Sequence, residues 1–306
     1  MIRVFIVGSP RGGTTVTQRL IAERGRLFTH PETQFFVRLV GNSEARFFSG
    51  NRFREPFLVR EKYRARQALR LSARRDWSDL EFIPQGLNNR RVPMRRLARA
   101  FTDGFDGMAR DHGLSGWVEK SPAHLHYIKE IQRYVPDARI VHIVRDGRDV
   151  VASRKDAAHH YGRHWVRYYS DILWNVDRWN NDIARSAAHV GDARHLFVDY
   201  ETLCEHTHGA LGIILQHIGA NQQGDPGENR TRFSLARTYE KWKRDSVNGE
   251  IVKAESKWMH VFSEDERAKA DGLFAPIPAH LKKALEDFRT RALEADNAAK
   301  AEGTGK

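Results

Sequence analysis

The chain has almost no cysteine: Cys204 is the single thiol among 306 residues. One cysteine excludes an intrachain disulfide and a zinc site built from several thiolates, and it agrees with a reducing compartment. Long apolar runs are missing too, since no segment approaches the roughly 18 apolar residues that a membrane-spanning helix needs. The apolar stretch before Gly8 is too short for a secretory signal peptide. We therefore expect a cytoplasmic protein without a transmembrane segment.

Metal-ligand patterns are also absent, although histidine is abundant. Fifteen histidines occur, but His159 and His160 are adjacent and therefore point in different directions. There is no HExxH helix, and no acidic residue is spaced to complete a ligand set. The sequence predicts no metal.

Acidic residues are in deficit. The 51 Lys and Arg residues outnumber the 39 Asp and Glu residues, and the formal net charge is +12. Residues 52–99 hold 14 basic and five acidic residues, so this segment carries +9 of that charge. Apolar residues at helical spacing among the arginines of 61–75 predict an amphipathic helix. The charge favours an anionic partner, but the segment lacks the regular aromatic residues of a nucleic-acid stacking surface.

What the chain does have is an alternation of short apolar runs with amphipathic helices. The apolar runs predict buried strands at 2–7, 115–119, 139–144 and 195–198. Helical periodicity follows three of them, from Thr14 to Arg24, from Ser121-Pro122 onward and from about Arg148. This order predicts an α/β fold with a doubly wound parallel sheet flanked by helices.

The alternating pattern defines one predicted domain over residues 1–293. A basic helical insertion interrupts it at about 41–113. Residues 294–306 have no periodic apolar face, so we expect this tail to be disordered.

A glycine-rich segment, Gly8-Ser-Pro-Arg-Gly-Gly-Thr-Thr, joins the first predicted strand to the first helix. The backbone amides of such a loop and the positive end of the following helix favour a phosphate or a sulfonate. The spacing is that of a Walker A loop, but Thr14 stands where the nucleotide-binding lysine is expected. Arg11 places a cation inside the loop instead. A P-loop kinase or NTPase therefore lacks its lysine here.

A second candidate anion site follows the strand predicted at 139–144. Arg145 comes directly after this strand, and Ser153 lies about two turns into the next helix. In open α/β sheets, ligands bind at the carboxyl ends of the strands. An arginine and a hydroxyl that converge there suit a second phosphate. The alternative is a solvated cluster of ion pairs between Arg145 and its charged neighbours.

The two segments together resemble the signature segments of sulfotransferases that use 3′-phosphoadenosine 5′-phosphosulfate (PAPS), in the same order and at a similar separation. Residues 117–122 and 198–201 resemble two further family segments, so the similarity extends over roughly 1–40 and 115–205. The bacterial and tyrosylprotein-type branch is the more similar one. Val16 replaces the tryptophan that stacks on adenine in the small-phenol branch.

The resemblance implies a P-loop-like fold and a cofactor site for PAPS as co-substrate, without a metal. It implies that the 5′-phosphosulfate binds Arg11, Gly12, Gly13, Thr14 and Thr15. It also implies that Arg145 and Ser153 bind the 3′-phosphate and that Tyr200 contacts the nucleotide.

Sulfuryl transfer needs a cation at the departing oxygen, donors for the other oxygens and a base for the acceptor's proton. Pro122 stands where the small-phenol branch has its catalytic histidine. The segment Pro31-Glu32-Thr33 resembles the Pro-Glu-Thr segment that supplies a catalytic glutamate in the tyrosylprotein-type branch. We predict Glu32 as the general base, with its pKa raised by apolar neighbours, and Lys120 and Arg11 at the sulfuryl group. The alternative bases are His30, His124 and water.

Each role has a plainer alternative. Glu32 and Thr33 can begin a helix, Lys120 can pair with Glu119, and Tyr200 can be a core residue at a strand end. Basic and aromatic residues at 241–244 can close over the 3′-phosphate or form a solvated surface.

The sequence therefore predicts a PAPS-dependent sulfotransferase that acts in line on a hydroxyl or amine of a small molecule, glycan or lipid. A kinase-like phosphotransferase would need Mg²⁺, a loop lysine and a Walker B aspartate. A non-catalytic polyanion-binding protein, built on residues 52–99, is the other alternative. We also hypothesise that 52–99 borders the acceptor cleft and favours an anionic acceptor.

Overall fold

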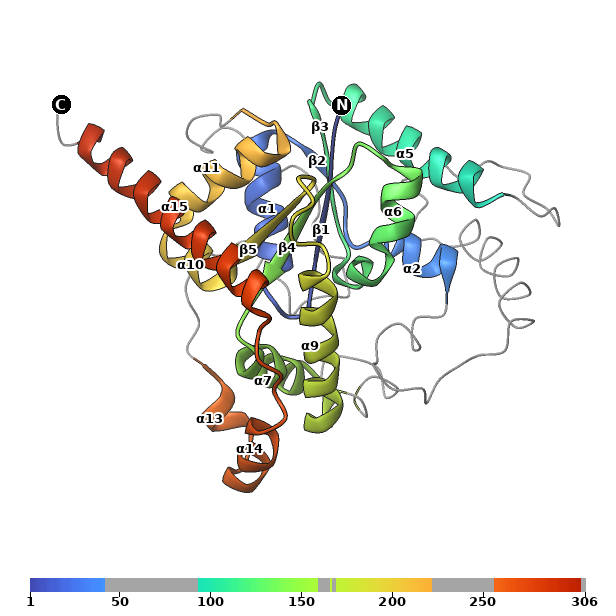
Figure 1. Cartoon of the computed structure of the whole chain (residues 1–306). Coiled ribbons are helices and arrows are strands. Elements are labelled where there is room, and N and C mark those ends of the chain that lie inside the picture. The colour runs from blue at the N-terminus through green and yellow to red at the C-terminus, as the bar shows by residue number, and fades with distance from the viewer. Residues whose placement is uncertain (42–92, 159–165, 167–168, 222–255, 304–306) are drawn as a thin grey trace.

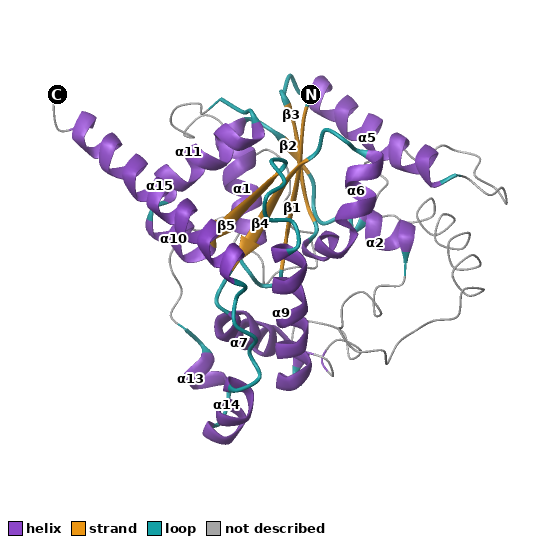
Figure 2. Ribbon diagram, in the orientation of Figure 1, coloured by secondary structure: helices purple, strands orange, loops and turns teal. Residues whose placement is uncertain are grey.

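The protein is described by a computed structural model over residues 1–41, 93–158, 166, 169–221 and 256–303. Its centre is a parallel five-stranded sheet (Figures 1 and 2). The strands are β1 (Ile2–Gly8), β2 (Phe28–Thr29), β3 (Gly116–Lys120), β4 (Arg139–Val144) and β5 (His195–Asp199). Their spatial order is β2-β3-β1-β4-β5, so β1 is central.

Helices connect the strands and cover both faces of the sheet (Figure 1). Before β4 they are α1 (Thr14–Gly25), α2 (Phe35–Val40), α5 (Met94–Asp111), the 3-10 helix η3 (Pro122–Tyr127) and α6 (Ile128–Tyr134). After β4 they are α7 (Gly147–Ala157), α9 (Ile172–Ala187), α10 (Tyr200–Glu205), α11 (Thr207–Ile218), α13 (Trp258–Val261), α14 (Glu264–Asp271) and α15 (Ala279–Gly303).

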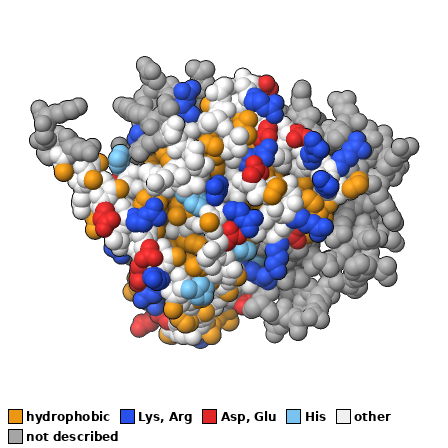
Figure 3. All heavy atoms as spheres, turned by 45° about the horizontal axis from the view of Figure 1, so that its top comes forward, with side chains coloured by type: hydrophobic (Ala, Val, Ile, Leu, Met, Phe, Trp, Pro, Cys, Tyr) orange, Lys and Arg blue, Asp and Glu red, His pale blue; other side chains and the backbone are white. Residues whose placement is uncertain are grey.

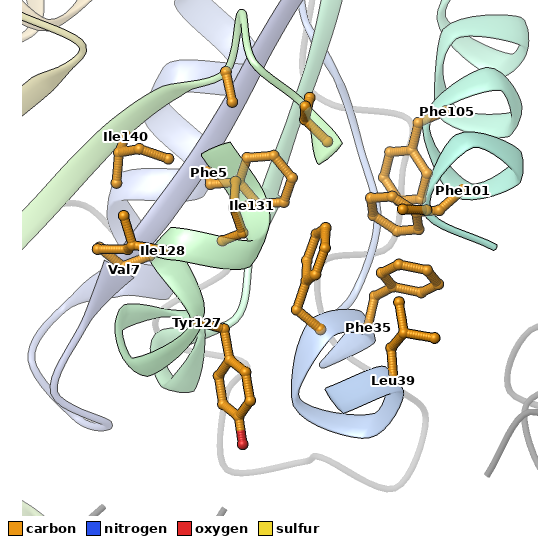
Figure 4. Close-up of a cluster of buried hydrophobic side chains, with 14 of the residues drawn as sticks. Phe5, Val7, Phe35, Leu39, Phe101, Phe105, Tyr127, Ile128, Ile131 and Ile140 are labelled. Atoms are coloured by element: carbon orange, nitrogen blue, oxygen red, sulfur yellow. The ribbon is translucent and has the colours of Figure 1, made fainter. Parts of the chain in front are cut away.

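The side chains of β1 alternate between two hydrophobic cores, as the period of a strand requires. Val4 and Ile6 pack in a core with α1, α11 and α15. Phe5 and Val7 pack on the opposite face with α2, α5 and α6 (Figure 4). Phe35 of α2 stacks on Phe101 of α5 with ring centroids 4.3 Å apart, and Phe36 meets Phe5 of β1 edge-on at 6.1 Å, so aromatic contacts join α2 to α5 and to the sheet.

The predicted α/β fold is confirmed, and each predicted strand is present with ends shifted by at most one or two residues. The helix expected from Pro122 begins as the 3-10 helix η3 and continues as α6. Strand β2 was not predicted, because two residues are too few to give an apolar run. Helix α5 also differs from expectation: it lies within the predicted basic insertion, yet it buries Leu97, Phe101 and Phe105 against the sheet.

The tail expected to be disordered from residue 294 instead continues helix α15 to Gly303. Alanine, glutamate and lysine are strong helix formers, which offsets the missing apolar periodicity. A tertiary contact also holds this part of the helix. The carboxylate of Asp296 accepts a hydrogen bond from the backbone amide of Gly209 (2.6 Å) and lies 3.2 Å from His206 Nδ1.

Some predictions concern residues outside the described ranges. They are the basic helix at 61–75 with most of the segment 52–99, and the basic and aromatic residues at 241–244. Among the described residues, no helix combines the length and the apolar character that a membrane crossing requires.

Candidate functional site

All predicted site residues follow the carboxyl ends of strands. In Figure 1, β1 starts beside the N-terminus at the top and runs downward, so these ends lie toward α7. Because the strands are parallel, the segments after β1, β2, β3, β4 and β5 meet at one edge of the sheet. The register places Lys120, the last residue of β3, beside Ile6, two residues before the loop that follows β1.

The loop between β1 and α1 has an unusual backbone. Arg11 and Gly13 both have positive φ, 72° and 91°. Gly13 also tolerates no side chain, because a Cβ there would overlap the ring of Tyr200. Thr14 is buried in the first turn of α1, and Thr15 is partly exposed beside it. The backbone thus curves as a phosphate-binding loop does, with the first amides of α1 at its end.

The two predicted anion anchors meet beside this loop. Arg11 Nε donates to the hydroxyl of Ser153 on α7 (3.2 Å). Arg145 Nη1 donates to the carbonyl oxygen of Arg11 (3.3 Å), and its guanidinium carbon lies 4.8 Å from the centroid of the Tyr200 ring. Four predicted cofactor-binding side chains from three strand ends are therefore contiguous, with two guanidinium groups among them.

The alternative of a simple ion-pair cluster around Arg145 fits only part of this geometry. Asp146 caps α7 by accepting hydrogen bonds from the amides of Arg148 and Asp149 (2.8 and 3.3 Å). The Arg148 side chain points away and pairs with Asp271 of α14 (2.8 Å). Arg145 itself lies 3.6 Å from Asp149.

Glu201 is a carboxylate near the anchors that the sequence did not single out for a role. Its Oε1 lies 4.0 Å from Nε of Arg145. Burial, together with the nearby charge of Asp199, raises the pKa of Glu201 to about 7. An acidic side chain that titrates near neutrality therefore borders Arg145.

The predicted base and its predicted partner form an ion pair. Lys120 Nζ donates to Glu32 Oε1 at 2.5 Å. The lysine side chain is fully buried, whereas 22% of the Glu32 side chain is exposed. A buried ammonium thus lies against a carboxylate that solvent, or a bound substrate, can reach. The carboxylate predicted as base and the cation predicted beside it are therefore neighbours at the carboxyl end of β3.

Lys120 does not pair with the adjacent Glu119, although the sequence left that open. The Glu119 carboxylate is fully buried and accepts hydrogen bonds from the hydroxyls of Thr33 (2.7 Å) and Ser121 (2.6 Å). His124 Nδ1 lies 2.9 Å from its second oxygen. Burial alone would raise the pKa of Glu119, but His124 and the two hydroxyls lower it below the usual value, which keeps this group ionised.

A buried charge network beneath the loop was missed by the sequence analysis. Ser9 donates to Asp182 Oδ2 on α9 (2.6 Å), and Arg154 Nε donates to the carbonyl oxygen of Pro10 (3.2 Å). Asp182 also accepts from Arg154 (3.4 Å) and Arg178 (2.9 Å). A buried aspartate and two arginines thereby tie the start of the loop to α7 and α9.

His126 completes this network, with Nε2 2.7 Å from Asp182 Oδ1. Burial and the adjacent Arg178 lower the pKa of His126 to about 4, so the imidazole is neutral at pH 7. Burial opposes ionisation of Asp182, but Arg178, His126 and Arg154 lower its pKa strongly. No local pattern marks Asp182, because it contacts Ser9 across 173 positions of the chain.

Two further features of the described residues are their potential metal ligands and their surface charge. Within the described ranges, no group of three or more His, Cys, Asp and Glu side chains is arranged to hold a metal ion. On the face shown in Figure 3, Lys and Arg are interspersed with Asp and Glu. Arg11, Arg145 and Lys120 lie at the carboxyl edge of the sheet.

Of three similar solved structures, one supports the fold and two are weaker matches. The sulfotransferase domain from the curacin biosynthetic pathway aligns with 92% of this chain and 95% of its own length, at 14% identity and a TM-score of 0.50. The sulfotransferase domain from the Synechococcus PCC 7002 olefin synthase aligns over 94% of both chains, at 16% identity and a TM-score of 0.49. A sulfotransferase from Alicyclobacillus acidocaldarius aligns with 94% of this chain and 99% of its own length, at 16% identity and a TM-score of 0.47.

Comparison at the level of sequence identifies the family. Curated protein sequences give no significant match. A profile of the sulfotransferase family, however, matches residues 3–224, which include the loop after β1, the Glu32–Lys120 pair and the Arg145 segment. Since this match covers well over half of the 306 residues, the chain belongs to the sulfotransferase family.

Proposed function

We propose that this protein is a PAPS-dependent sulfotransferase that transfers the sulfuryl group to a hydroxyl or amine, with Glu32 as the general base. The observation that supports this most is the position of the Glu32–Lys120 ion pair. It lies at the same edge of the sheet as the loop in which Arg11 contacts Ser153. A carboxylate suited to act as a base, a buried cation and two groups suited to anions thus lie where α/β proteins bind ligands, which supports the proposal.

The described residues fit the two anionic groups of the donor. The curved backbone from Arg11 to Thr15 and the N-terminus of α1 suit the 5′-phosphosulfate. Arg145 and Ser153 suit the 3′-phosphate, with Tyr200 against the nucleotide. In this proposal the donor is a co-substrate, and no metal takes part.

The proposed reaction is an in-line displacement at sulfur. The acceptor oxygen or nitrogen forms a bond to sulfur while the bond from sulfur to the bridging phosphate oxygen breaks. Glu32 takes the acceptor's proton, and adenosine 3′,5′-bisphosphate leaves with the bond's electron pair. Lys120 and Arg11 stabilise the charge that develops on the oxygens of the departing and transferring groups, as preorganised cations do in phosphoryl transfer.

The acceptor is proposed only by class. A small molecule, glycan or lipid with a hydroxyl or amine fits the chemistry of a carboxylate base. The net charge of +9 on residues 52–99 favours an anionic acceptor over a neutral one. Nucleic acid is not proposed as a partner.

Two measurements test the proposal. Incubation with PAPS labelled in the sulfuryl group and a cell extract, followed by mass spectrometry, should give a labelled acceptor. In thermal-shift assays, adenosine 3′,5′-bisphosphate should raise the Tm without Mg²⁺, and more than adenosine 5′-phosphate does. A rise with ATP–Mg²⁺ alone would favour a phosphotransferase. A rise with heparin alone would favour a polyanion-binding protein.

A further inference from the structure

The segment that carries Glu32 is held through its backbone amides. The amide of Thr33 donates to Glu119 (3.3 Å) and that of Gln34 to the hydroxyl of Ser121 (2.8 Å). The amide of Phe36 donates to Nε2 of His124 (3.1 Å). Three side chains from 119–124 thus bind amides at and before the start of α2, where a helix leaves its first amides without partners.

Glu119 is the centre of this arrangement. Besides the Thr33 amide, its Oε1 accepts from the hydroxyls of Thr33 (2.7 Å) and Ser121 (2.6 Å). The Thr33 hydroxyl in turn accepts from the amide of Phe35 (3.1 Å). The Thr33 amide and the two hydroxyls donate to the same oxygen of a Glu119 side chain that has no exposed surface. The contacts therefore depend on each other, because a shift of the carboxylate would break several of them.

The hydrogen-bond pattern also assigns the proton of His124. Since Nε2 accepts from the Phe36 amide, the hydrogen of the neutral ring lies on Nδ1, which faces Glu119 Oε2 at 2.9 Å. The carboxylate thus has three donors on Oε1 and the His124 ring beside Oε2, and it does not take the Lys120 ammonium. That leaves Lys120 directed at Glu32.

Consecutive residues of β3 hold consecutive residues of the Glu32 segment. Glu119 and Lys120 point to opposite sides of the strand, as neighbours in a strand do. Lys120 binds the carboxylate of Glu32, while Glu119 binds both the amide and the hydroxyl of Thr33. Two attachment points one residue apart restrict both the position and the direction of the Glu32 side chain. One point alone would leave the segment free to rotate about it.

We infer that Glu119, acting through Thr33 and supported by Ser121 and His124, is a positioning residue for the proposed base Glu32. This inference rests on the proposed function, since it gives Glu119 a role in catalysis without contact with either substrate. Misplacing a catalytic group by about 1 Å can cost roughly 100-fold in rate. The buried carboxylate should therefore affect turnover rather than donor binding.

The test is Thr33→Val, which keeps the shape of the side chain and removes the hydroxyl that Glu119 binds. We expect kcat to fall roughly 10- to 100-fold, with the KM for PAPS and the Kd for adenosine 3′,5′-bisphosphate within about twofold of wild type. The acidic limb of the kcat–pH profile should also move, because the carboxylate of Glu32 loses its fixed place beside Lys120. Thr33→Ser, which retains the hydroxyl, should restore most of the turnover.

Thr102→Val is the matched control. Thr102 is also buried, and its hydroxyl donates to the backbone oxygen of Ala98 within α5, away from the site. Its variant should lose a similar amount of thermal stability and keep kcat and the pH profile. If Thr33→Val does not fold, Ser121→Ala removes the acceptor of the Gln34 amide and should lower kcat at unchanged nucleotide Kd.

The outcomes separate the inference from the proposed function. If wild type transfers the sulfuryl group but the Thr33 and Ser121 variants keep kcat within twofold, Glu119 does not position the base, and the proposed function stands. An equal loss of kcat in the Thr102 variant would also overturn the inference, because the effect would then follow stability alone. If wild type transfers no sulfuryl group under any condition, the proposed function fails and the inference falls with it.

Discussion

The carboxyl edge of the sheet and a histidine cluster near the start of β5 differ in the charge of their polar side chains. The side chains at the edge are ionised, whereas those in the cluster are neutral. At the carboxyl edge, Lys120 is buried against the partly exposed carboxylate of Glu32. Arg11 and Arg145 lie at the loop that follows β1, whose residues are outside the hydrogen-bond ladder of the sheet. Charged groups persist there because each has a partner or access to solvent.

The histidine cluster consists of His142, His189 and His195. His142 Nε2 lies 2.8 Å from Nδ1 of His195, and the rings of His189 and His195 stack with centroids 4.8 Å apart. Burial lowers the pKa of all three, that of His195 to about 4. Here the rings are packed together in neutral form, with the charged Asp192 at the edge of the cluster, 3.7 Å from His195. The comparison teaches that this fold holds charged side chains where its strands end and neutral imidazoles beside β4 and β5.

Glu32→Gln should give the largest effect at the carboxyl edge. A neutral amide cannot take the acceptor's proton, so we expect turnover to fall by about two to four orders of magnitude while nucleotide affinity remains. Activity assays with isothermal calorimetry measure both quantities. The exposed Glu294→Gln on α15 is the matched control and should behave like wild type. Turnover within a few-fold of wild type would reassign the base to His30 or water, since His124 is buried and its Nε2 accepts from the Phe36 amide.

The histidine cluster should lower the free energy of unfolding as the pH decreases. The pKa of His195 is about 4 in the folded protein and near 6.5 when unfolded, so the unfolded chain binds more protons between these values. Stability is therefore complete above about pH 6.5 and decreases as the pH falls to about 4, by about 3 kcal/mol for this group. Urea unfolding from pH 7.5 to 4.5 measures the decrease.

His195→Asn sharpens this prediction, because it removes the titrating ring and should flatten the dependence on pH. Part of the dependence should remain, since the pKa of His126 is also about 4. An unchanged slope in the variant would show that the cluster does not set the acid sensitivity.

Arg145→Ala tests the anion anchor. Loss of a charged hydrogen bond should weaken binding of adenosine 3′,5′-bisphosphate by about 1.5–3 kcal/mol, or roughly 10- to 150-fold. Adenosine 5′-phosphate, which lacks the 3′ group, should lose much less. Equal losses for the two ligands in calorimetry would remove Arg145 from the 3′-phosphate site.

Glu201→Gln should give the smallest effect. The pKa of Glu201 is about 7, so its charge appears beside Arg145 as the pH rises through neutrality. In wild type the Kd for adenosine 3′,5′-bisphosphate should therefore increase a few-fold between pH 6.5 and 8, an effect of about 1 kcal/mol or less. The variant should bind equally well over this range. A parallel increase in both proteins would assign the dependence to another group.

Much of the fold could be predicted from local patterns. The branched apolar runs at 2–7 and 139–144 form β1 and β4, and the glycine-rich segment between β1 and α1 forms the predicted loop. These features depend on the preferences of neighbouring residues and on burial of short apolar runs. The contiguity of Arg11 with Ser153 also agrees with the two family segments that suggested it.

The local patterns could not predict which charged side chains pair with each other. Spacing alone allowed Lys120 to pair with Glu119, its neighbour in the chain. In the structure Lys120 pairs with Glu32, 88 positions away in the chain. Glu119 instead accepts hydrogen bonds from the hydroxyls of Thr33 and Ser121. The reason is direction: neighbours in a strand point to opposite sides, and only the packing of the segment before α2 against the end of β3 determines what each side meets.

The sequence by itself determined four of the five strands, the glycine-rich loop and the order of the charged segments, because these follow from local composition and periodicity. Only the tertiary structure decided which side chains meet. The sheet order β2-β3-β1-β4-β5 places the ends of distant segments at one edge, and it brings α9 close enough for Asp182 to bind Ser9. The physical reason is that a buried charge is stable only beside suitable partners, and long-range packing supplies them.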